Sequence, residues 1–205
     1  MSPSQAPDTT RRRVLAAAGL GLAAAALQAR GPANAATVYA QPPTVDLEPD
    51  GVYASASVVF ALPVALEDAL RRGIPLYFLT RISVTQSRWW WFNASLGEAQ
   101  QLTRLGYEPL LGKYRVVTGA LRTSYGSLDE ALNQVQHISR LKVADAAALK
   151  RGESYQVGGH FELDLSQLPR PFQLNVSSQT EWQLEADFPR VSFTWTPTPS
   201  TAPPG

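Results

Sequence analysis

The sequence predicts an antiparallel β-sandwich, Ig-like in style, with about seven strands and two short helices. Apolar and polar residues alternate in several runs of the chain, as they do in half-buried strands. Glycine and proline residues separate these runs. The 205 residues are 44% hydrophobic and contain no cysteine, which suits one soluble domain without disulfide bonds.

The first 35 residues have the features of a cleaved export signal. Arginines at positions 11–13 precede an apolar run over 14–27, and an A-x-A motif over 33–35 follows. We therefore expect cleavage between Ala35 and Ala36. The apolar run is shorter than the roughly 20 residues that span a bilayer, so we expect no stable membrane anchor after cleavage. The arginine pattern resembles a twin-arginine signal, with general secretion as the alternative.

Such a leader predicts a periplasmic or secreted protein. Its removal takes away four of the 18 basic and one of the 17 acidic residues, which leaves a net charge near −2. No basic patch then remains to indicate binding to nucleic acid or to an anionic membrane. The absence of cysteine excludes thiolate nucleophiles and thiolate metal ligands.

The exported part begins with a proline-rich stretch, residues 36–50, that predicts a linker ending in a turn. A strand is expected over 52–62, and Pro63 then opens a short helix over 64–72. The run over 74–92 is the longest, most β-prone and most aromatic in the chain. It predicts the central strand.

Three consecutive tryptophans end this central strand. Even-numbered residues form its core face, so unbroken alternation would bury Trp90 and leave Trp89 and Trp91 outside. A bulge near residues 86–87 would reverse the faces. Arg88 is a poor core residue, which favours the bulge and an exposed Trp90. The alternative is that all three tryptophans fill a wide core or cover a sheet edge.

The second half of the chain contains shorter elements. Residues 98–110 predict an irregular run, and 113–118 and 121–125 predict two strands that begin with a hairpin. Residues 139–152 predict an irregular connection. Alternation resumes in the strand predicted over 153–166.

A capping box formed by Ser127 and Glu130 begins the second helix. The buried stripe of this helix extends to Ile138, which places His137 on the solvent face and makes it neither a ligand nor a base.

The last clear strand is predicted over 181–188, after a rigid loop that docks Phe172 on the core. The Thr/Pro tail, residues 196–205, cannot bury apolar surface and is expected to be disordered. These boundaries predict a single sandwich domain over residues 51–195.

Eight short motifs occur in a fixed order between residues 52 and 172. They are Val52-Tyr53-Ala54-Ser55-Ala56, Phe60-Ala61-Leu62-Pro63, Leu66-Glu67-Asp68-Ala69-Leu70, Gly73-Ile74-Pro75-Leu76-Tyr77-Phe78, Arg88-Trp89-Trp90-Trp91-Phe92, Tyr114-Arg115-Val116, Leu128-Asp129-Glu130-Ala131-Leu132 and Leu168-Pro169-Arg170-Pro171-Phe172. Together they resemble the exported bacterial family called domain of unknown function 4390. The resemblance implies a periplasmic or exported protein of beta-proteobacterial type. The family's association with genes near a nitrogen-regulation sensor kinase implies a signalling accessory, and no catalytic residue is carried over.

Catalytic chemistry has weak support in the sequence. Both histidines fall on predicted outer faces, and no Gly-x-Ser-x-Gly elbow is present. The acidic pairs Glu67-Asp68 and Asp129-Glu130 lie on helix faces or at helix starts, where solvation and the helix dipole explain them. We therefore expect no enzyme activity and no cofactor, and a hydrolase is the least favoured function.

The strand predicted over 153–166 contains one possible metal site. His160, Glu162 and Asp164 point outward, and an imidazole with two carboxylates suits a divalent metal. However, His160 and Asp164 lie about 13 Å apart along an extended strand. Three ligands so spread do not converge on one ion, so the sequence predicts no metal site.

The remaining expectation is binding. Arg81, Arg88, Trp90, Lys113 and Arg115 form a candidate interaction surface if the bulge exists and their strands are neighbours. The principal hypothesis is a non-catalytic periplasmic interaction module, accessory to an envelope sensor or assembly, with an envelope protein as partner. The alternative is a small-molecule or glycan-binding domain that stacks its ligand on the tryptophans. An ordinary mixed sheet surface would account for the same residues.

Overall fold

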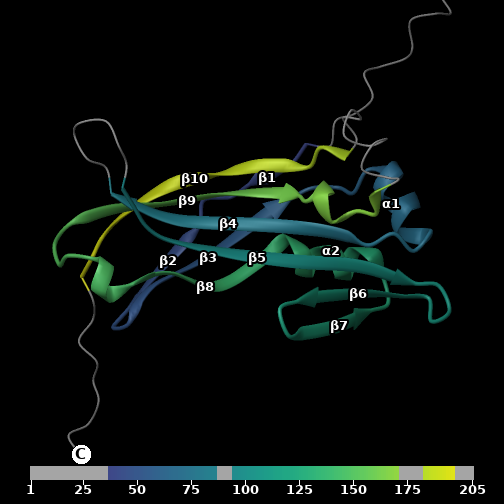
Figure 1. Ribbon diagram of the computed structural model, residues 1–205, viewed down its shortest axis with the longest axis horizontal. Coiled ribbons are helices and arrows are strands. Elements are labelled where there is room, and N and C mark those ends of the chain that lie inside the picture. Colours follow the sequence, from purple (N-terminus) through teal and green to yellow (C-terminus); the bar gives the residue numbers. More distant parts are fainter. Residues whose placement is uncertain (1–36, 87–93, 171–181, 197–205) are drawn as a thin grey trace, which may run out of the picture. The chain divides into compact units, whose positions relative to one another are not determined.

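Two antiparallel sheets form the part of the protein that the computed structural model describes, residues 37–86, 94–170 and 182–196 (Figure 1). The six-stranded sheet has the order β10-β9-β4-β5-β6-β7, and in the four-stranded sheet β3 pairs with β1, β2 and β8. The strands are β1 (Tyr39–Ala40), β2 (Thr44–Glu48), β3 (Gly51–Val59), β4 (Leu76–Gln86), β5 (Ala94–Glu108), β6 (Lys113–Thr118), β7 (Leu121–Tyr125), β8 (His137–Asp145), β9 (Ser154–Leu163) and β10 (Glu185–Thr194). The predicted antiparallel sandwich is confirmed.

Helices occupy the connections between strands. α1 (Val64–Arg71) joins β3 to β4, and α2 (Leu128–Gln136) joins β7 to β8. Two short 3-10 turns, η1 (Ala146–Ala148) and η2 (Leu165–Gln167), flank β9. The two predicted short helices are therefore present.

β4 is an interior strand of the large sheet, paired with β5 on one side and β9 on the other. Leu76, Phe78, Ile82 and Val84 are buried as the alternation predicted. The odd-numbered residues of β4 consequently form part of the outer face of this sheet.

Three aromatic side chains lie at the centre of the core. Phe60, Phe78 and Phe161 are buried, and their ring centroids are between 5.6 and 5.8 Å apart. Such spacings give favourable ring contacts in addition to the burial of apolar area. The core is continuous from α1 through both sheets to α2.

The stretch expected as a linker forms two strands. Within residues 36–50, β1 pairs with the end of β3 and β2 pairs with its beginning. The linker prediction was wrong because its prolines lie between and after the two strands, where they cost no ladder hydrogen bond.

The run over 98–110, expected to be irregular, belongs to the long strand β5. Its inward positions include Gln101 and Thr103, which face Thr80 and Phe78 across the sheet. The Thr103 hydroxyl is satisfied by Thr118, at 3.2 Å. Polar residues on the inner face blurred the alternation that would have indicated a strand.

The connection expected over 139–152 contains most of β8. Arg140 has a positive φ of 51°, and the pairing of β3 with β8 shifts register twice. These irregularities break the period of two, which is why the sequence did not indicate a strand. The second helix accordingly ends at Gln136, and Ile138 lies in β8 rather than on the helix.

The last strand begins and ends at other residues than predicted. Trp182 and Leu184 are buried before β10 begins, and β10 continues to Thr194 instead of ending at Phe188. A register shift between Phe188 and Val191 interrupts the alternation that would have shown this continuation.

Several sequence-based predictions lie outside the described residues. These are the leader and its cleavage site at Ala35 and Ala36, the run that holds Arg88 and Trp90, the docking of Phe172, and the tail after residue 196. Within the residues described, the register of β4 with β5 shifts between Val84 and Thr85, where the extra residue, Leu96, belongs to β5 and not to β4. The described helices include none that is both long and apolar enough to cross a bilayer.

Candidate functional site

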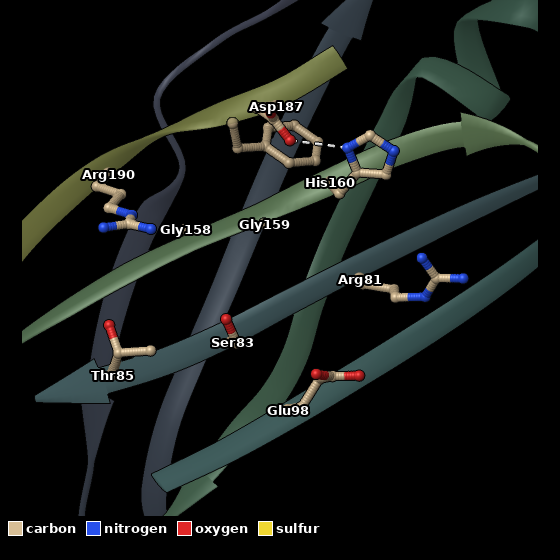
Figure 2. A pocket seen from close by; sticks show the side chains of 10 residues that line it. Arg81, Ser83, Thr85, Glu98, Gly158, Gly159, His160, Asp187 and Arg190 are labelled. Atoms are coloured by element: carbon tan, nitrogen blue, oxygen red, sulfur yellow. Dashed lines mark hydrogen bonds and ion pairs between the residues drawn. The ribbon is translucent and has the colours of Figure 1, made fainter. Parts of the chain in front are cut away.

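A polar hollow of about 440 Å³ lies on the outer face of the six-stranded sheet (Figure 2). It extends over β10, β9 and β4 and reaches Glu98 of β5. Its walls are formed by Arg81, Ser83, Thr85, Glu98, Gly158, Gly159, His160, Asp187, Phe188 and Arg190.

Two consecutive glycines create the floor of this hollow. Gly158 lies opposite Ser83 on the outer face, so no side chain rises there, whereas Gly159 lies opposite the buried Ile82 and lines the hollow with its backbone. The β10 bulge between Phe188 and Val191 brings Arg190 beside Gly158, where a Cβ atom would lie 3.0 Å from the Arg190 Cγ. The missing side chain at Gly158 and the bulge together give the sheet a concave surface.

His160 is held by two acidic side chains. Its Nδ1 lies 2.8 Å from the Asp187 Oδ1, and its Nε2 lies 3.8 Å from the Glu162 Oε2. Arg81 donates to the other oxygen of Glu162, Oε1, at 2.9 Å. In Figure 2 the dashed line joins His160 to Asp187, above the glycine floor.

The hollow offers groups of both charges to a ligand. Arg190 makes no ion pair with any described residue, and Ser83 and Thr85 add hydroxyls. Glu98 supplies a carboxylate on the opposite side. A hollow so lined suits a small polar or zwitterionic molecule better than an apolar one.

A hydrolytic arrangement of these groups is not formed in the described part of the chain. Ser83 lines the same hollow as His160, but the Nε2 of His160 is directed at Glu162 and not at a hydroxyl. A serine nucleophile requires a hydrogen bond to its general base. The arrangement therefore does not support the hydrolase alternative.

A second exposed feature is the tip of the hairpin between β5 and β6. Leu110 is 100% exposed and Leu111 is 64% exposed. Below the tip, the rings of Tyr107 and Tyr114 lie 4.9 Å apart. The backbone N–H groups of Leu111 and Gly112 both donate to the Glu108 carbonyl, which fixes the turn.

The described members of the predicted interaction surface share one sheet face but do not meet. Arg81 lies opposite Gln100 of β5, whereas Arg115 lies opposite Gly106. Six residues of extended strand separate them by about 20 Å. Arg81 and Arg115 are each ion-paired, with Glu162 and Glu108, and Lys113 makes no ion pair with a described residue.

Arg88 and Trp90, the other two members, lie outside the described residues. Sequence reasoning also missed the two leucines of the hairpin tip. The signal was present, since Pro109-Leu110-Leu111-Gly112 places two leucines in a turn that cannot bury them.

A charged cluster occupies the outer face of the four-stranded sheet, away from the hollow. Lys142 contacts Asp50 and Asp145, each at 2.9 Å, and Tyr53 donates to Asp50 at 2.8 Å. The hydrogen bond from Lys142, followed by that from Tyr53, lowers the pKa of Asp50. The two carboxylates raise the pKa of Lys142, and the Asp50 carboxylate raises that of Tyr53.

The fold and the hollow define the class as a β-sandwich domain with a polar recess on one sheet. Comparison with protein families gives the particular family: the pattern of the Domain of unknown function (DUF4390) matches residues 35–192. The chain belongs to this family, and the resemblance predicted from its motifs is confirmed. No curated protein and no solved structure matched the chain.

Proposed function

We propose that the protein is a non-catalytic periplasmic interaction module that binds an envelope protein through the β5–β6 hairpin tip. The observation that carries this proposal is the exposure of Leu110 and Leu111 on a fixed turn. Two adjoining exposed leucines form a small apolar patch, and contiguous exposed apolar patches mark sites of protein interaction.

The tip lies on a rigid support. Arg115 pairs with Glu108 at 2.7 Å, next to the ring contact between Tyr107 and Tyr114. A preorganised tip loses little conformational entropy when it binds. The hairpin therefore has the properties of an anchor for a concave apolar pocket.

The charges around the tip favour a protein over a lipid surface. Recognition of anionic lipids by charge uses clusters of about 4–8 basic residues. Here Arg115 is neutralised by Glu108, and Lys113 is the one basic side chain of β6 without a described ion-pair partner. An accessory role toward an envelope sensor or assembly fits such a protein contact.

Site-specific photo-crosslinking in cells tests the proposal. A photoreactive residue at Lys113, beside the tip, should capture one envelope protein repeatedly. Capture should fall at least tenfold when Leu110 and Leu111 are both changed to serine. The matched control is Leu102→Ser, because Leu102 is an exposed leucine of β5 on the outer sheet face. Equal capture by the double variant and the control would disprove the role of the tip.

A second candidate function is supported by the hollow itself. Its volume of about 440 Å³ falls in the range of small-molecule sites, and its side chains are polar. We propose binding of a polar fragment of an envelope sugar or peptide there, with Arg190 contacting its anionic group. Calorimetric titration of a panel of such compounds tests this, and Arg190→Gln should weaken any binding found. An absence of heat for the whole panel would remove this candidate.

A further inference from the structure

Three potential metal ligands converge beside the hollow from two neighbouring strands. His160 and Glu162 are two residues apart on β9 and share its outer face, and Glu185 of β10 lies directly opposite Glu162. One ligand atom from each of the three residues lies within 4.8 Å of the other two. The pairing of β9 with β10 thus brings together three potential ligands, which the spacing of residues along one strand would keep apart.

Asp164 is not the third member of this group. Its carboxylate instead accepts the Ser166 N–H at 3.0 Å and caps η2. The expectation that His160, Glu162 and Asp164 do not converge agrees with this placement. The sequence alone predicts no metal site because Glu185 lies 23 residues beyond Glu162 along the chain, and strand pairing brings the two together.

The atoms that would not bind a metal already have partners. Asp187 holds the Nδ1 of His160 at 2.8 Å, and Arg81 holds the Oε1 of Glu162 at 2.9 Å. The remaining atoms, Nε2 of His160 and Oε2 of Glu162, face each other at 3.8 Å. Metal-binding histidines usually have their second nitrogen fixed by a carboxylate or carbonyl in this way.

The charges also favour a cation. Glu162 and Glu185 are directly opposed across the two strands, and like charges in that position repel. Together with Asp187 they place three carboxylates near His160, and the Arg81 guanidinium pairs with one of them, Glu162. A divalent ion bound between Glu162 and Glu185 would relieve the repulsion of their like charges.

We propose that His160, Glu162 and Glu185 bind a divalent transition-metal ion of the zinc class. Ligand bonds of about 2.1 Å in a tetrahedral site place neighbouring ligand atoms about 3.4 Å apart. The 3.8 Å contact is close to this value, and the exposed Glu185 side chain has to move by no more than about 1.4 Å, the difference between 4.8 and 3.4 Å. Asp187 and Arg81 act as positioning residues.

The ligand set selects among metals. An imidazole with carboxylates suits zinc and its neighbours, whereas magnesium and calcium prefer oxygen ligands alone. Three protein ligands leave the fourth position of a tetrahedral ion free for water or for an anionic group of a bound molecule. The inference does not depend on the hairpin tip, and the two proposals fail or succeed separately.

Calorimetric titration of the purified, untagged chain with Zn²⁺ at pH 7 tests the site. The wild type should bind one ion, and His160→Ala and Glu185→Gln should each weaken binding at least tenfold. Asp187→Asn should weaken it about 10–100-fold, the usual effect of losing such a partner. The matched control is His137→Ala, which removes the other histidine of the chain and should leave affinity unchanged.

Two further measurements make the result decisive. Thermal unfolding in the presence of a chelator should give similar melting temperatures for wild type and Glu185→Gln, so that lost binding is not lost folding. A millimolar excess of Mg²⁺ should not displace Zn²⁺. The proposal is overturned if the wild type binds no Zn²⁺, if His137→Ala weakens binding as much as His160→Ala, or if folded Glu185→Gln binds like the wild type.

Discussion

Arg190 lies across Gly158, so that a Cβ atom on this glycine would lie 3.0 Å from the Arg190 Cγ. The flexible arginine can turn aside. At the next residue, Gly159, a Cβ atom would lie 2.1 Å from the backbone carbonyl oxygen of Arg81, which belongs to the neighbouring strand. The two glycines of the hollow therefore differ in what they tolerate.

We predict that Gly158→Ala lowers the free energy of unfolding by no more than about 1 kcal/mol, whereas Gly159→Ala costs more than about 3 kcal/mol. The reason is that the second change forces β4 and β9 apart. Urea unfolding followed by circular dichroism measures both values. Equal costs for the two variants would mean that the floor of the hollow adapts more freely than the close backbone contact implies.

Leu105 and Leu110 provide a second comparison within one hairpin. Leu105 is fully buried and Leu110 is fully exposed. We predict that Leu105→Ala costs about 2–5 kcal/mol of unfolding free energy, as buried leucines do. Leu110→Ala should change it by less than about 0.5 kcal/mol. A large cost for Leu110→Ala in urea unfolding would show that the tip is packed and not free to bind.

The carboxyl group of Asp50 should make stability depend on pH at the acid end. Lys142 and Tyr53 lower its pKa in the folded state below the ordinary value of 3.8. A lowered pKa stabilises the fold above the unfolded-state value, and this contribution is lost as pH falls through the folded-state value. The difference in melting temperature between wild type and Asp50→Asn should therefore be constant near pH 6 and shrink below about pH 4.

The same substitution, Asp50→Asn, made in a Lys142→Met variant tests the cause of the lowered pKa of Asp50. In Lys142→Met the largest contribution to the lowered pKa of Asp50 is absent. The effect of Asp50→Asn on the melting temperature near pH 6 should then be smaller than in the wild type. An unchanged effect would show that Tyr53 alone accounts for the interaction.

Ser127 should matter for α2 through its hydroxyl. Its Oγ accepts the Glu130 N–H at 3.3 Å, while the Glu130 carboxylate accepts the Gly126 N–H at 3.2 Å. We predict that Ser127→Ala costs about 1 kcal/mol of unfolding free energy and that Ser127→Asp retains most of the stability. Thermal unfolding of both variants measures this. Equal losses in both would point to packing at residue 127 and not to capping.

The strands that were predicted well from the sequence are those with one buried, mainly apolar face. In β4 and β9 most inward residues are apolar, Thr80 being an exception, and the side chains of Phe78, Ile82, Val157 and Phe161 are buried as expected. β5 and β8 were missed because Gln101 and Thr103 face inward in one, and Arg140 interrupts the other with a positive φ. The alternation of apolar and polar residues along a strand does not show which polar side chains are hydrogen-bonded to a neighbouring strand and can therefore face inward.

The candidate sites were less predictable than the fold, because they depend on which strands are neighbours. Nothing in the spacing along the chain places Glu185 opposite Glu162, or Arg190 beside Gly158. Both relations come from the pairing of β9 with β10 and from the bulge in β10. His160 and Arg81 were each singled out from the sequence, but for separate reasons, and the structure brings them to the same hollow.

The length of β5 sets the distance between the two proposed binding positions. This single strand lends Glu98 to the hollow and ends at Glu108, at the base of the leucine tip. Ten residues of extended chain separate the two positions by about 33 Å. β5 is paired with β4 over its first part and with β6 over its last part, so ligands at the two proposed positions would lie far apart on one strand and would not compete.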